Sequence, residues 1–300
     1  MLHANLIGMN ERTSATLAPT KLTDRLPPHL YFVISAFFHY LGPAFAVLLF
    51  ARVEPLGVAW LRIATAAIIF AIWRRPWRFF ILLDTGERWI VVALGVALAL
   101  MNASFYLALA HLPLGTVGAI EFLGPIGLAV YGMRTTRNIS ALLVAICGVY
   151  ILTNVRFEGA AISYFYAFAN CALFLIYIVL GHRIAGKGAA GGIDQLGMAM
   201  LIALAVSLPI GFSEAAVAFT VPELLGAGIV VGICSSVIPY VCDQFAMARL
   251  PRASFALMLA LLPATATVIG VVVLRQFPTS AELAGVALVV IGVAVHQVEK

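Results

Sequence analysis

Long apolar runs, bounded by proline, glycine or charged residues, follow one another along most of the chain. They are unbroken rather than alternating, and each exceeds the roughly ten residues of a membrane β-strand, so they predict helices. A helix that spans a bilayer takes about 20 mainly apolar residues. Ten runs meet this description, at about residues 30–50, 55–73, 89–110, 113–132, 138–154, 160–181, 195–212, 223–247, 251–273 and 280–297. The pattern predicts an all-α membrane protein with ten transmembrane helices.

The composition excludes two other classes of protein. The 300 residues are 63% hydrophobic and 10% charged, with a mean hydropathy of +1.06. An average soluble domain has about 25% charged residues, so a soluble fold of this composition would expose large apolar patches. Disordered segments require low hydrophobicity, so disorder is excluded as well. Ten spans leave only short connections, which have no room for an extramembrane domain.

Lysine and arginine are distributed unevenly between the connections. If the N-terminus is cytoplasmic, fourteen of the 18 lie on the cytoplasmic side, Arg52, Arg156 and Arg275 lie outside, and Arg62 lies within a span. Cytoplasmic connections are rich in basic residues, so both termini are predicted to face the cytoplasm, and the location is the cell inner membrane. Residues 1–28 are expected to form a polar cytoplasmic tail, because they lack the apolar core of a removable signal peptide.

Two similar segments indicate an internal repeat. The sequence Ala110-His111-Leu112-Pro113 matches Ala248-Arg249-Leu250-Pro251, and a further proline follows twelve residues after each, at Pro125 and Pro263. Gly148-Val149 and Gly292-Val293 then correspond in the next helix of each half. The halves are predicted at residues 29–154 and 155–300, with five helices each. An odd number of helices inserts the second copy upside down, which is typical of secondary transporters that work by alternating access.

Several segments of the chain resemble a known family. The pattern Pro55…Trp60-Leu61-Arg62, the Leu112-Pro113 pair and the Gly148-Val149 pair resemble the drug/metabolite transporter superfamily, with its two EamA-type repeats. The segment at residues 119–125, AIEFLGP, is similar to the signature of its threonine/homoserine and aromatic amino-acid exporter branch. The resemblance implies ten helices around a central cavity and export of amino acids. The second copy departs from the signature, because Leu259 stands where Glu121 stands in the first.

Glu121 and Arg62 are charged residues predicted near the middle of the membrane. Glu121 lies eight residues into the fourth span, about 12 Å along a helix, and Arg62 lies seven residues into the second. Charged groups at this depth face a partner or a cavity. Two interpretations stay open. The two side chains form a structural ion pair, or Glu121 borders a cavity and meets a substrate ammonium group or a proton.

Polar and aromatic residues recur at helical spacing in several spans. Such side chains can hydrogen-bond a zwitterion, and aromatic faces can hold its ammonium group or an apolar side chain. The alternative is that they join helices to one another. The predicted cavity residues are His39, Trp60, Asn102, Tyr106, Glu121, Tyr166, Asn170, Tyr177, Ser236, Tyr240 and Gln244.

A second group of residues is assigned to gating or to helix bends. Asp243, near the cytoplasmic end of the eighth span, is expected either to pair with Arg249 or Arg252 or to bind a proton in gating. His39 is either a hydrogen-bonded packing residue or a proton-linked group. Four prolines within spans are predicted bend points or simple packing kinks, at Pro43, Pro125, Pro239 and Pro263.

The chain lacks the motifs of several other functional classes. It contains no H-E-x-x-H, no G-x-G-D and no P-loop, and its six histidines are scattered, so neither an enzyme nor an ATP-driven pump is predicted. Its four cysteines lie inside apolar runs and are interpreted as small buried hydrophobic residues. No metal site, cofactor or nucleic-acid partner is predicted.

The sequence thus predicts a secondary transporter that exports amino acids through a cavity between the repeats. Aromatic and other neutral amino acids, such as threonine or methionine, are expected substrates, with broad specificity and weak affinity. Protons are a candidate coupling ion, and we expect a monomer in the lipid bilayer. The alternatives are an exporter of other small metabolites or drugs and a channel-like facilitator, although no selectivity filter or ring of charges is present.

Overall fold

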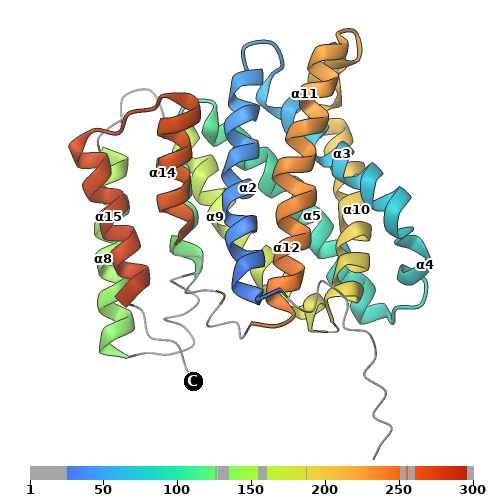
Figure 1. Ribbon diagram of the computed structural model, residues 1–300, viewed down its shortest axis with the longest axis horizontal. Coiled ribbons are helices and arrows are strands. Elements are labelled where there is room, and N and C mark those ends of the chain that lie inside the picture. Colours follow the sequence, from blue (N-terminus) through green and yellow to red (C-terminus); the bar gives the residue numbers. More distant parts are fainter. Residues whose placement is uncertain are drawn as a thin grey trace, which may run out of the picture.

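The computed structural model describes residues 26–125, 127, 135–154, 161–186, 188–250, 255 and 261–295. In these ranges all regular structure is helical, with no strand (Figure 1). The elements are α2 (Pro28–Leu49), α3 (Pro55–Arg74), α4 (Trp77–Phe80), α5 (Thr85–Leu109), α6 (Leu114–Glu121), α8 (Thr136–Asn154), α9 (Ala161–Ala185), α10 (Ala189–Ala215), η1 (Ala216–Phe219), α11 (Pro222–Gly232), η2 (Ile233–Val237), α12 (Ile238–Met247), α14 (Leu261–Leu274) and α15 (Ser280–Val295).

Six continuous helical segments of the described chain are long and apolar enough to cross a membrane. They are Pro28–Leu49, Pro55–Arg74, Thr85–Leu109, Ala161–Ala185, Ala189–Phe219 and Pro222–Met247. Shorter apolar helices cover Thr136–Leu152, Leu262–Leu274 and Ser280–Gly292. Each of the ten predicted spans overlaps a described helix, and the all-helical membrane fold is confirmed. The count of ten spans and the side of the two termini stay predictions, and most of the predicted tail lies outside the described residues.

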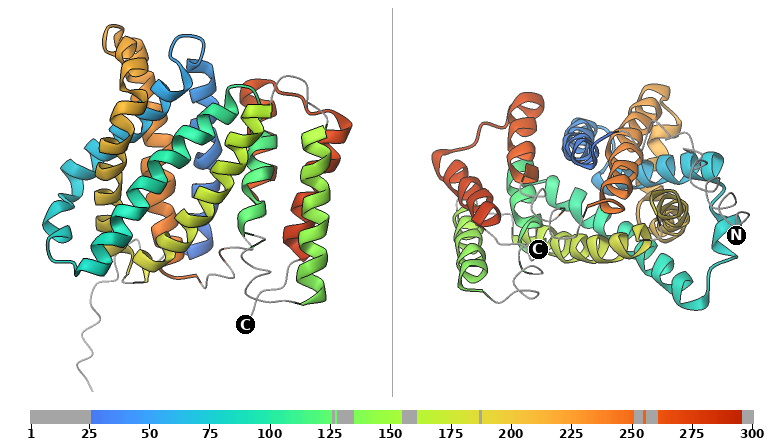
Figure 2. Two further views of the ribbon diagram at one scale, coloured as in Figure 1. Left: turned by 180° about the vertical axis from the view of Figure 1, so that it is seen from behind. Right: turned by 60° about the horizontal axis from the view of Figure 1, so that its bottom comes forward.

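The helices associate in pairs drawn from the two ends of the chain. α3 packs along α10, α8 along α15, and α6 against α14. α5 packs against α9 and α10, while α2 packs against α11, η2 and α12. The pair of α8 and α15 lies at one edge of the bundle, beside α14 (Figures 1 and 2). Each of these contacts therefore joins a helix of the first predicted half to a helix of the second.

Glycine allows two of these pairs to approach closely. A Cβ atom at Gly148 of α8 would lie 2.6 Å from the carbonyl oxygen of Gly285 in α15. A Cβ atom at Gly57 of α3 would lie 2.7 Å from the carbonyl carbon of Glu214 in α10. Both distances are shorter than a carbon atom tolerates, so backbones meet directly here, as small residues permit in membrane helices.

Polar contacts fix α3 to α10 at both ends. At one end, the Gly57 N–H donates to the Glu214 carboxylate at 3.1 Å, which satisfies one of the free N–H groups of the helix start. At the other end, Arg74 donates to both carboxylate oxygens of Asp194, at 2.7 and 2.9 Å. α3, which carries Arg62 at its middle, is thus held in register with α10.

A π-helical turn interrupts the segment that runs from α11 to α12. Over Ile233–Val237 the hydrogen bonds widen, and the Ile238 N–H donates to the Ile233 carbonyl, five residues earlier. Pro239 follows this turn and has no N–H to donate to the carbonyl of Ser235. Single π-turns are frequent at functional sites, and the sequence analysis did not predict this one.

The remaining proline and cysteine predictions have mixed outcomes. Pro43 lies inside α2 and Pro263 lies near the start of α14, while Pro125 belongs to a helical turn after α6. Cys171 and Cys242 are buried as expected, but Cys147 is exposed on α8, so its predicted burial is wrong. α8 is an edge helix, and a thiol on its outer face has an apolar neighbourhood when that face meets lipid.

Candidate functional site

Arg62 is the central buried cation of the described residues, with only 3% of its surface exposed. Its Nε donates to the Ser236 hydroxyl at 2.7 Å, and its Nη2 donates to the Ser235 carbonyl at 2.5 Å and to the Tyr240 hydroxyl at 3.4 Å. The guanidinium carbon lies 5.7 and 5.9 Å from the ring centres of Tyr106 and Tyr240. All these partners are neutral, so the charge is held by dipoles and aromatic faces.

The Ser235 carbonyl accepts from Arg62 because of the local helix geometry. The π-turn and Pro239 remove the ordinary i+4 donor of this carbonyl, which leaves it able to accept a side-chain hydrogen bond. The interruption in the helix therefore supplies the carbonyl acceptor that binds the buried guanidinium of Arg62.

Glu121 is the last residue of α6 and is 2% exposed. Its two carboxylate oxygens accept one hydrogen bond each, from the Tyr40 hydroxyl and from Nδ2 of Asn170, both at 3.0 Å. No ion pair joins Glu121 to Arg62 in the described part of the chain, so the interpretation as a structural ion pair is wrong. Both side chains have the expected burial, but each faces neutral partners on other helices.

Asp243 of α12 is a second buried carboxylate, 6% exposed. It accepts from the Ser35 hydroxyl at 2.5 Å and from the Tyr177 hydroxyl at 2.8 Å. The expected pair with Arg249 is wrong, because Arg249 instead donates to the Leu26 and Phe245 carbonyls. Arg252 lies outside the described residues. The side chain of Asp243 points into the bundle, whereas that of Arg249 lies at its end, over the ring of Tyr31.

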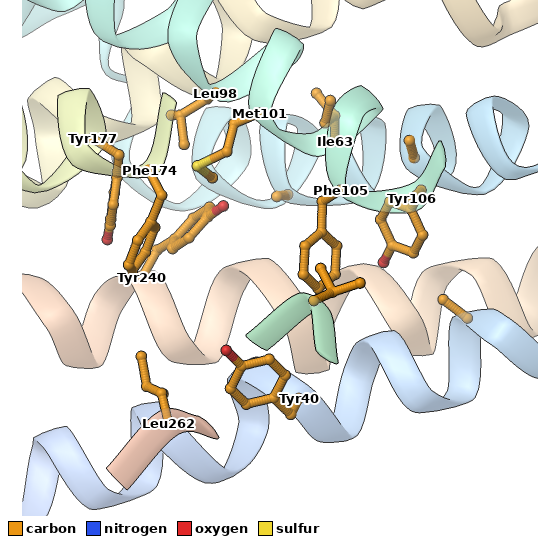
Figure 3. Close-up of a cluster of buried hydrophobic side chains, with 14 of the residues drawn as sticks. Tyr40, Ile63, Leu98, Met101, Phe105, Tyr106, Phe174, Tyr177, Tyr240 and Leu262 are labelled. Carbon is orange, nitrogen blue, oxygen red and sulfur yellow. The ribbon is translucent and has the colours of Figure 1, made fainter. Parts of the chain in front are cut away.

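Aromatic rings connect the Arg62 and Asp243 sites. The ring of Tyr240, which contacts Arg62, lies 5.4 Å from the ring of Tyr177, which donates to Asp243. Phe174 stacks on Tyr177 at 5.9 Å. Figure 3 shows these three rings together, with Tyr40 and Tyr106 elsewhere in the same buried cluster.

A small cavity of about 10 Å³, with room for about one water molecule, borders Asp243. Its wall is formed by Phe32, Ser35, Ala36, His39, Phe174, Tyr177, Asp243, Phe255 and Leu262. His39 makes ring contacts with Tyr40 and Phe174, and no hydrogen bond to its imidazole is found among the described residues. The interpretation of His39 as a hydrogen-bonded packing residue therefore has no support in this part of the chain.

Several buried polar atoms have no hydrogen-bond partner among the described residues. They are Trp60 Nε1, Asn102 Oδ1, Tyr106 Oη, Asn170 Oδ1, Gln195 Nε2, and both Nε2 and Oε1 of Gln244. A buried polar atom left unpaired costs about 1–3 kcal/mol, and such atoms are few in ordinary protein interiors. They are therefore able to form further hydrogen bonds with a polar partner.

Comparison with known proteins places the chain in a family. Residues 161–296 match the model of the EamA-like transporter family. The threonine/homoserine exporter RhtA of Escherichia coli K12 is 30% identical over 256 residues, which is 83% of this chain and 84% of the relative. RhtA of Salmonella typhimurium SL1344 is 29% identical over 278 residues, covering 89% and 91%. The chain belongs to the EamA-like transporter family. It is a multi-pass inner-membrane transporter of the RhtA-like branch of the drug/metabolite transporter superfamily, and not an enzyme.

A solved crystal structure agrees with this fold. It shares 20% sequence identity with the chain and superposes with a TM-score of 0.60, over 90% of this chain and 98% of the other. At this identity the likeness concerns the fold alone.

The structure of this family member brings most of the predicted cavity residues into the buried polar region, but not all. Trp60 packs instead against Phe212 and Phe219, with ring centres at 5.1 and 6.1 Å. Tyr166 is half-buried beside the exposed Phe165. Their place in a substrate site stays a prediction.

Ser35 donates to Asp243 and belongs to the polar stripe that the sequence shows through His39, one turn later. Three other contributors were absent from the predicted set. Tyr40 donates to Glu121, the Ser235 carbonyl accepts from Arg62, and Gln195 has an unpaired amide nitrogen. Tyr40 lies outside that stripe, and a backbone carbonyl has no sequence signature.

Proposed function

We propose that this transporter exports amino acids from the cytoplasm by alternating access, with threonine and homoserine as first candidates and other neutral amino acids as further substrates. The names of the RhtA relatives support the substrate class. In this proposal ten transmembrane helices form two inverted repeats, residues 29–154 and 155–300, and both termini are cytoplasmic.

One observation carries the proposal: three buried ionisable side chains lie in the bundle without a direct ion pair between them. Arg62 can bind a carboxylate, and Glu121 and Asp243 can each bind an ammonium group. An amino acid supplies both of these groups. In a purely structural core, a buried cation and a buried carboxylate would be expected to pair directly, because that lowers the cost of burying each charge.

The hydrogen bonds of these three side chains cross between the proposed repeats. Arg62 of the first repeat donates to Ser236 of the second. Glu121 of the first accepts from Asn170 of the second, and Asp243 of the second accepts from Ser35 of the first.

A substrate that competes for these groups would weaken the contacts between the repeats. In the proposed mechanism its carboxylate binds Arg62 in place of the neutral partners of the guanidinium, and its ammonium group binds a carboxylate. A ligand shifts a conformational equilibrium only through different affinities for the two states. Replacement of cross-repeat bonds by bonds to substrate supplies such a difference.

The packing of the helices supports the inverted repeat. Under the proposed correspondence, α3 is equivalent to α10, α6 to α14 and α8 to α15. Each of these equivalent pairs is in direct contact, as expected for elements next to a pseudo-two-fold axis. The packing of α5 on α9 has its counterpart in that of α12 on α2.

The neutral surroundings of the site support broad specificity. Hydroxyl, amide and ring groups dominate it, and a net neutral hydrogen bond contributes only about 0.5–1.5 kcal/mol. We therefore expect half-saturation in the millimolar range, with several neutral amino acids accepted.

Efflux from proteoliposomes tests the function. Vesicles with purified protein are loaded with labelled threonine, homoserine, methionine, phenylalanine or a sugar as control, with and without a pH gradient. Saturable efflux and counterflow of several amino acids are expected. Failure to move any amino acid would overturn the proposed substrate class, and flux that does not saturate would favour a channel-like facilitator.

Reporter fusions test the topology. Fusions after residues 78, 137 and 300 should report a cytoplasmic location, and fusions after residues 53 and 157 an external one. A reporter at residue 300 on the external side would require an odd number of spans and would overturn the ten-helix arrangement.

A further inference from the structure

A second cavity lies at the end of the bundle that the charge distribution assigns to the cytoplasm. It has a volume of about 430 Å³ and lies between the start of α5, the end of α9 and the start of α10. This volume is far larger than that of the cavity beside Asp243, which is about 10 Å³. It is within the range of about 300–1,000 Å³ found for small-molecule pockets.

The wall of this second cavity carries both signs of charge. α5 contributes Asp84, at its N-cap, and Glu87, while α9 contributes Arg183 from its last turn. Glu87 and Asp84 are acidic neighbours on one element, and the cation comes from another. A ligand that carries both an ammonium group and a carboxylate has charges of the right signs for such a wall.

Gln195 of α10 forms the buried part of the same wall. It is 3% exposed, and its amide nitrogen has no hydrogen-bond partner among the described residues. A buried donor that lines a cavity without a partner is costly to the protein, unless a ligand accepts the bond.

Gln244 contacts the two helices, α9 and α10, that also line the second cavity. Gln244, which follows Asp243 on α12, places its amide between Gly181 of α9 and Gly192 of α10. A Cβ atom at Gly181 would lie 3.9 Å from Nε2 of Gln244, and one at Gly192 would collide with its Oε1. Gly192 is one helical turn before Gln195, so the residue that contacts Gln244 and the residue that lines the cavity are neighbours on α10.

We propose that this cavity is a cytoplasmic vestibule that binds the free amino acid before it reaches the buried charges. Asp84 and Glu87 face its ammonium group, Arg183 binds its carboxylate, and the Gln195 amide donates a further hydrogen bond. The Gln244 amide then separates the vestibule from Asp243. This inference rests on the proposed function and adds a second site for the same substrate class.

The vestibule predicts a distinctive response to loss of either charge. A free amino acid has no net charge at neutral pH, so the general field of the surface changes its local concentration little. A site that contacts both the ammonium group and the carboxylate of the amino acid loses affinity when either contact is removed. A cationic ligand, in contrast, would bind more weakly without Glu87 and more tightly without Arg183.

The first experiment measures efflux kinetics with substrate on the cytoplasmic face. Glu87→Gln, Arg183→Gln and Gln195→Leu should each raise the half-saturation concentration about three- to tenfold, with the maximal rate within about twofold of wild type. Arg78→Gln removes the same charge from an exposed residue of the same face that lines no described cavity, and should leave both values unchanged.

The outcomes separate this proposal from the proposed function. Wild-type protein with saturable flux, and variants that match Arg78→Gln, would overturn the vestibule alone. Opposite shifts for Glu87→Gln and Arg183→Gln would also overturn it. Absence of amino-acid flux in the wild type would overturn the proposed function, and the vestibule with it.

The second experiment reads occupancy without transport. Ile90 lines the cavity, so an Ile90→Cys variant with the four native cysteines replaced by alanine is alkylated with a membrane-impermeant maleimide. Saturating substrate should slow the alkylation several-fold, and Arg183→Gln should remove this protection. The headgroup of phosphatidylethanolamine also carries an ammonium group and an anionic group. Vesicles of phosphatidylcholine with and without phosphatidylethanolamine therefore distinguish binding of a lipid headgroup from binding of a free amino acid. Protection by phosphatidylethanolamine without substrate, or none by substrate, would overturn the proposal.

Discussion

Asp243 and Glu121 have similar immediate surroundings and very different positions. Each carboxylate accepts one tyrosine hydroxyl and one further neutral donor, and each has a partner in the other proposed repeat. Asp243 borders the cavity shared with His39 and Phe174, whereas Glu121 borders neither that cavity nor the proposed vestibule. One carboxylate therefore borders a small internal cavity, whereas the other is enclosed by its partners. We infer that Asp243 serves transport and that Glu121 mainly serves the stability of the bundle.

The largest effect is expected for Asp243→Asn. A hydrogen bond to a charged group contributes about 1.5–3 kcal/mol, so loss of the charge should lower efflux about 10- to 100-fold. The asparagine still fits between Ser35 and Tyr177, but its hydrogen bonds to both become neutral ones, so stability should fall by about 1–3 kcal/mol. Efflux per folded protein measures the effect. Glu223→Gln is the control for loss of an acidic charge at an exposed position, and should change efflux less than twofold. Wild-type efflux in Asp243→Asn would contradict the inferred role.

Glu121→Gln should lower stability to a similar extent but leave efflux largely intact. The glutamine oxygen still accepts from Asn170 and its NH₂ group can donate to the Tyr40 hydroxyl, but both hydrogen bonds become neutral ones, which costs about 1–3 kcal/mol. The melting temperature in detergent should fall, while efflux per folded protein stays within about threefold of wild type. Unchanged stability together with lost efflux would place Glu121 in the substrate site after all.

Removal of the hydroxyl of Tyr177 or of Tyr40 tests the difference between the two carboxylates, because each tyrosine donates to one of them. Tyr177→Phe should lower efflux about three- to tenfold, because the Asp243 carboxylate loses a positioning donor beside the cavity. Tyr40→Phe removes the equivalent donor from Glu121 and should lower stability by about 1 kcal/mol with little change in efflux. Equal effects of both substitutions on efflux would remove the distinction between the two carboxylates.

The smallest effect is expected for a double-mutant cycle between Arg62 and Glu121. These side chains are not in contact, so the stability effects of Arg62→Gln and Glu121→Gln should add within about 0.5 kcal/mol. Recovery of stability in the double variant would show the direct pair that the structure lacks, since a broken buried pair costs about 3–5 kcal/mol.

The sequence was sufficient to predict the class of fold and the family, but only part of the site. Apolar run length determines where helices form, and the segment containing Glu121 identified the branch. Depth along a helix correctly placed Arg62 and Glu121 in the interior. Depth does not determine which neighbour a side chain meets, because that depends on the rotation and contacts of several helices.

The errors at Arg62 and Asp243 have this common cause. Opposite charges at similar depth suggested a pair, yet Arg62 binds a serine carbonyl exposed by a π-turn. A π-turn depends on how the helix packs, and no residue pattern predicted it. Proximity in sequence suggested Arg249 for Asp243, but the two side chains point in different directions.

The two polar ties of α3 to α10 also constrain how the lengths of these helices can change. Gly57 is held to Glu214 at one end, and Arg74 to Asp194 at the other. One inserted residue lengthens a helix by about 1.5 Å and rotates everything beyond it by about 100°. An insertion in either helix would therefore break one tie unless the other helix changed with it. We expect the length of each helix to constrain that of the other, so that differences in length among relatives occur mainly in the connecting loops.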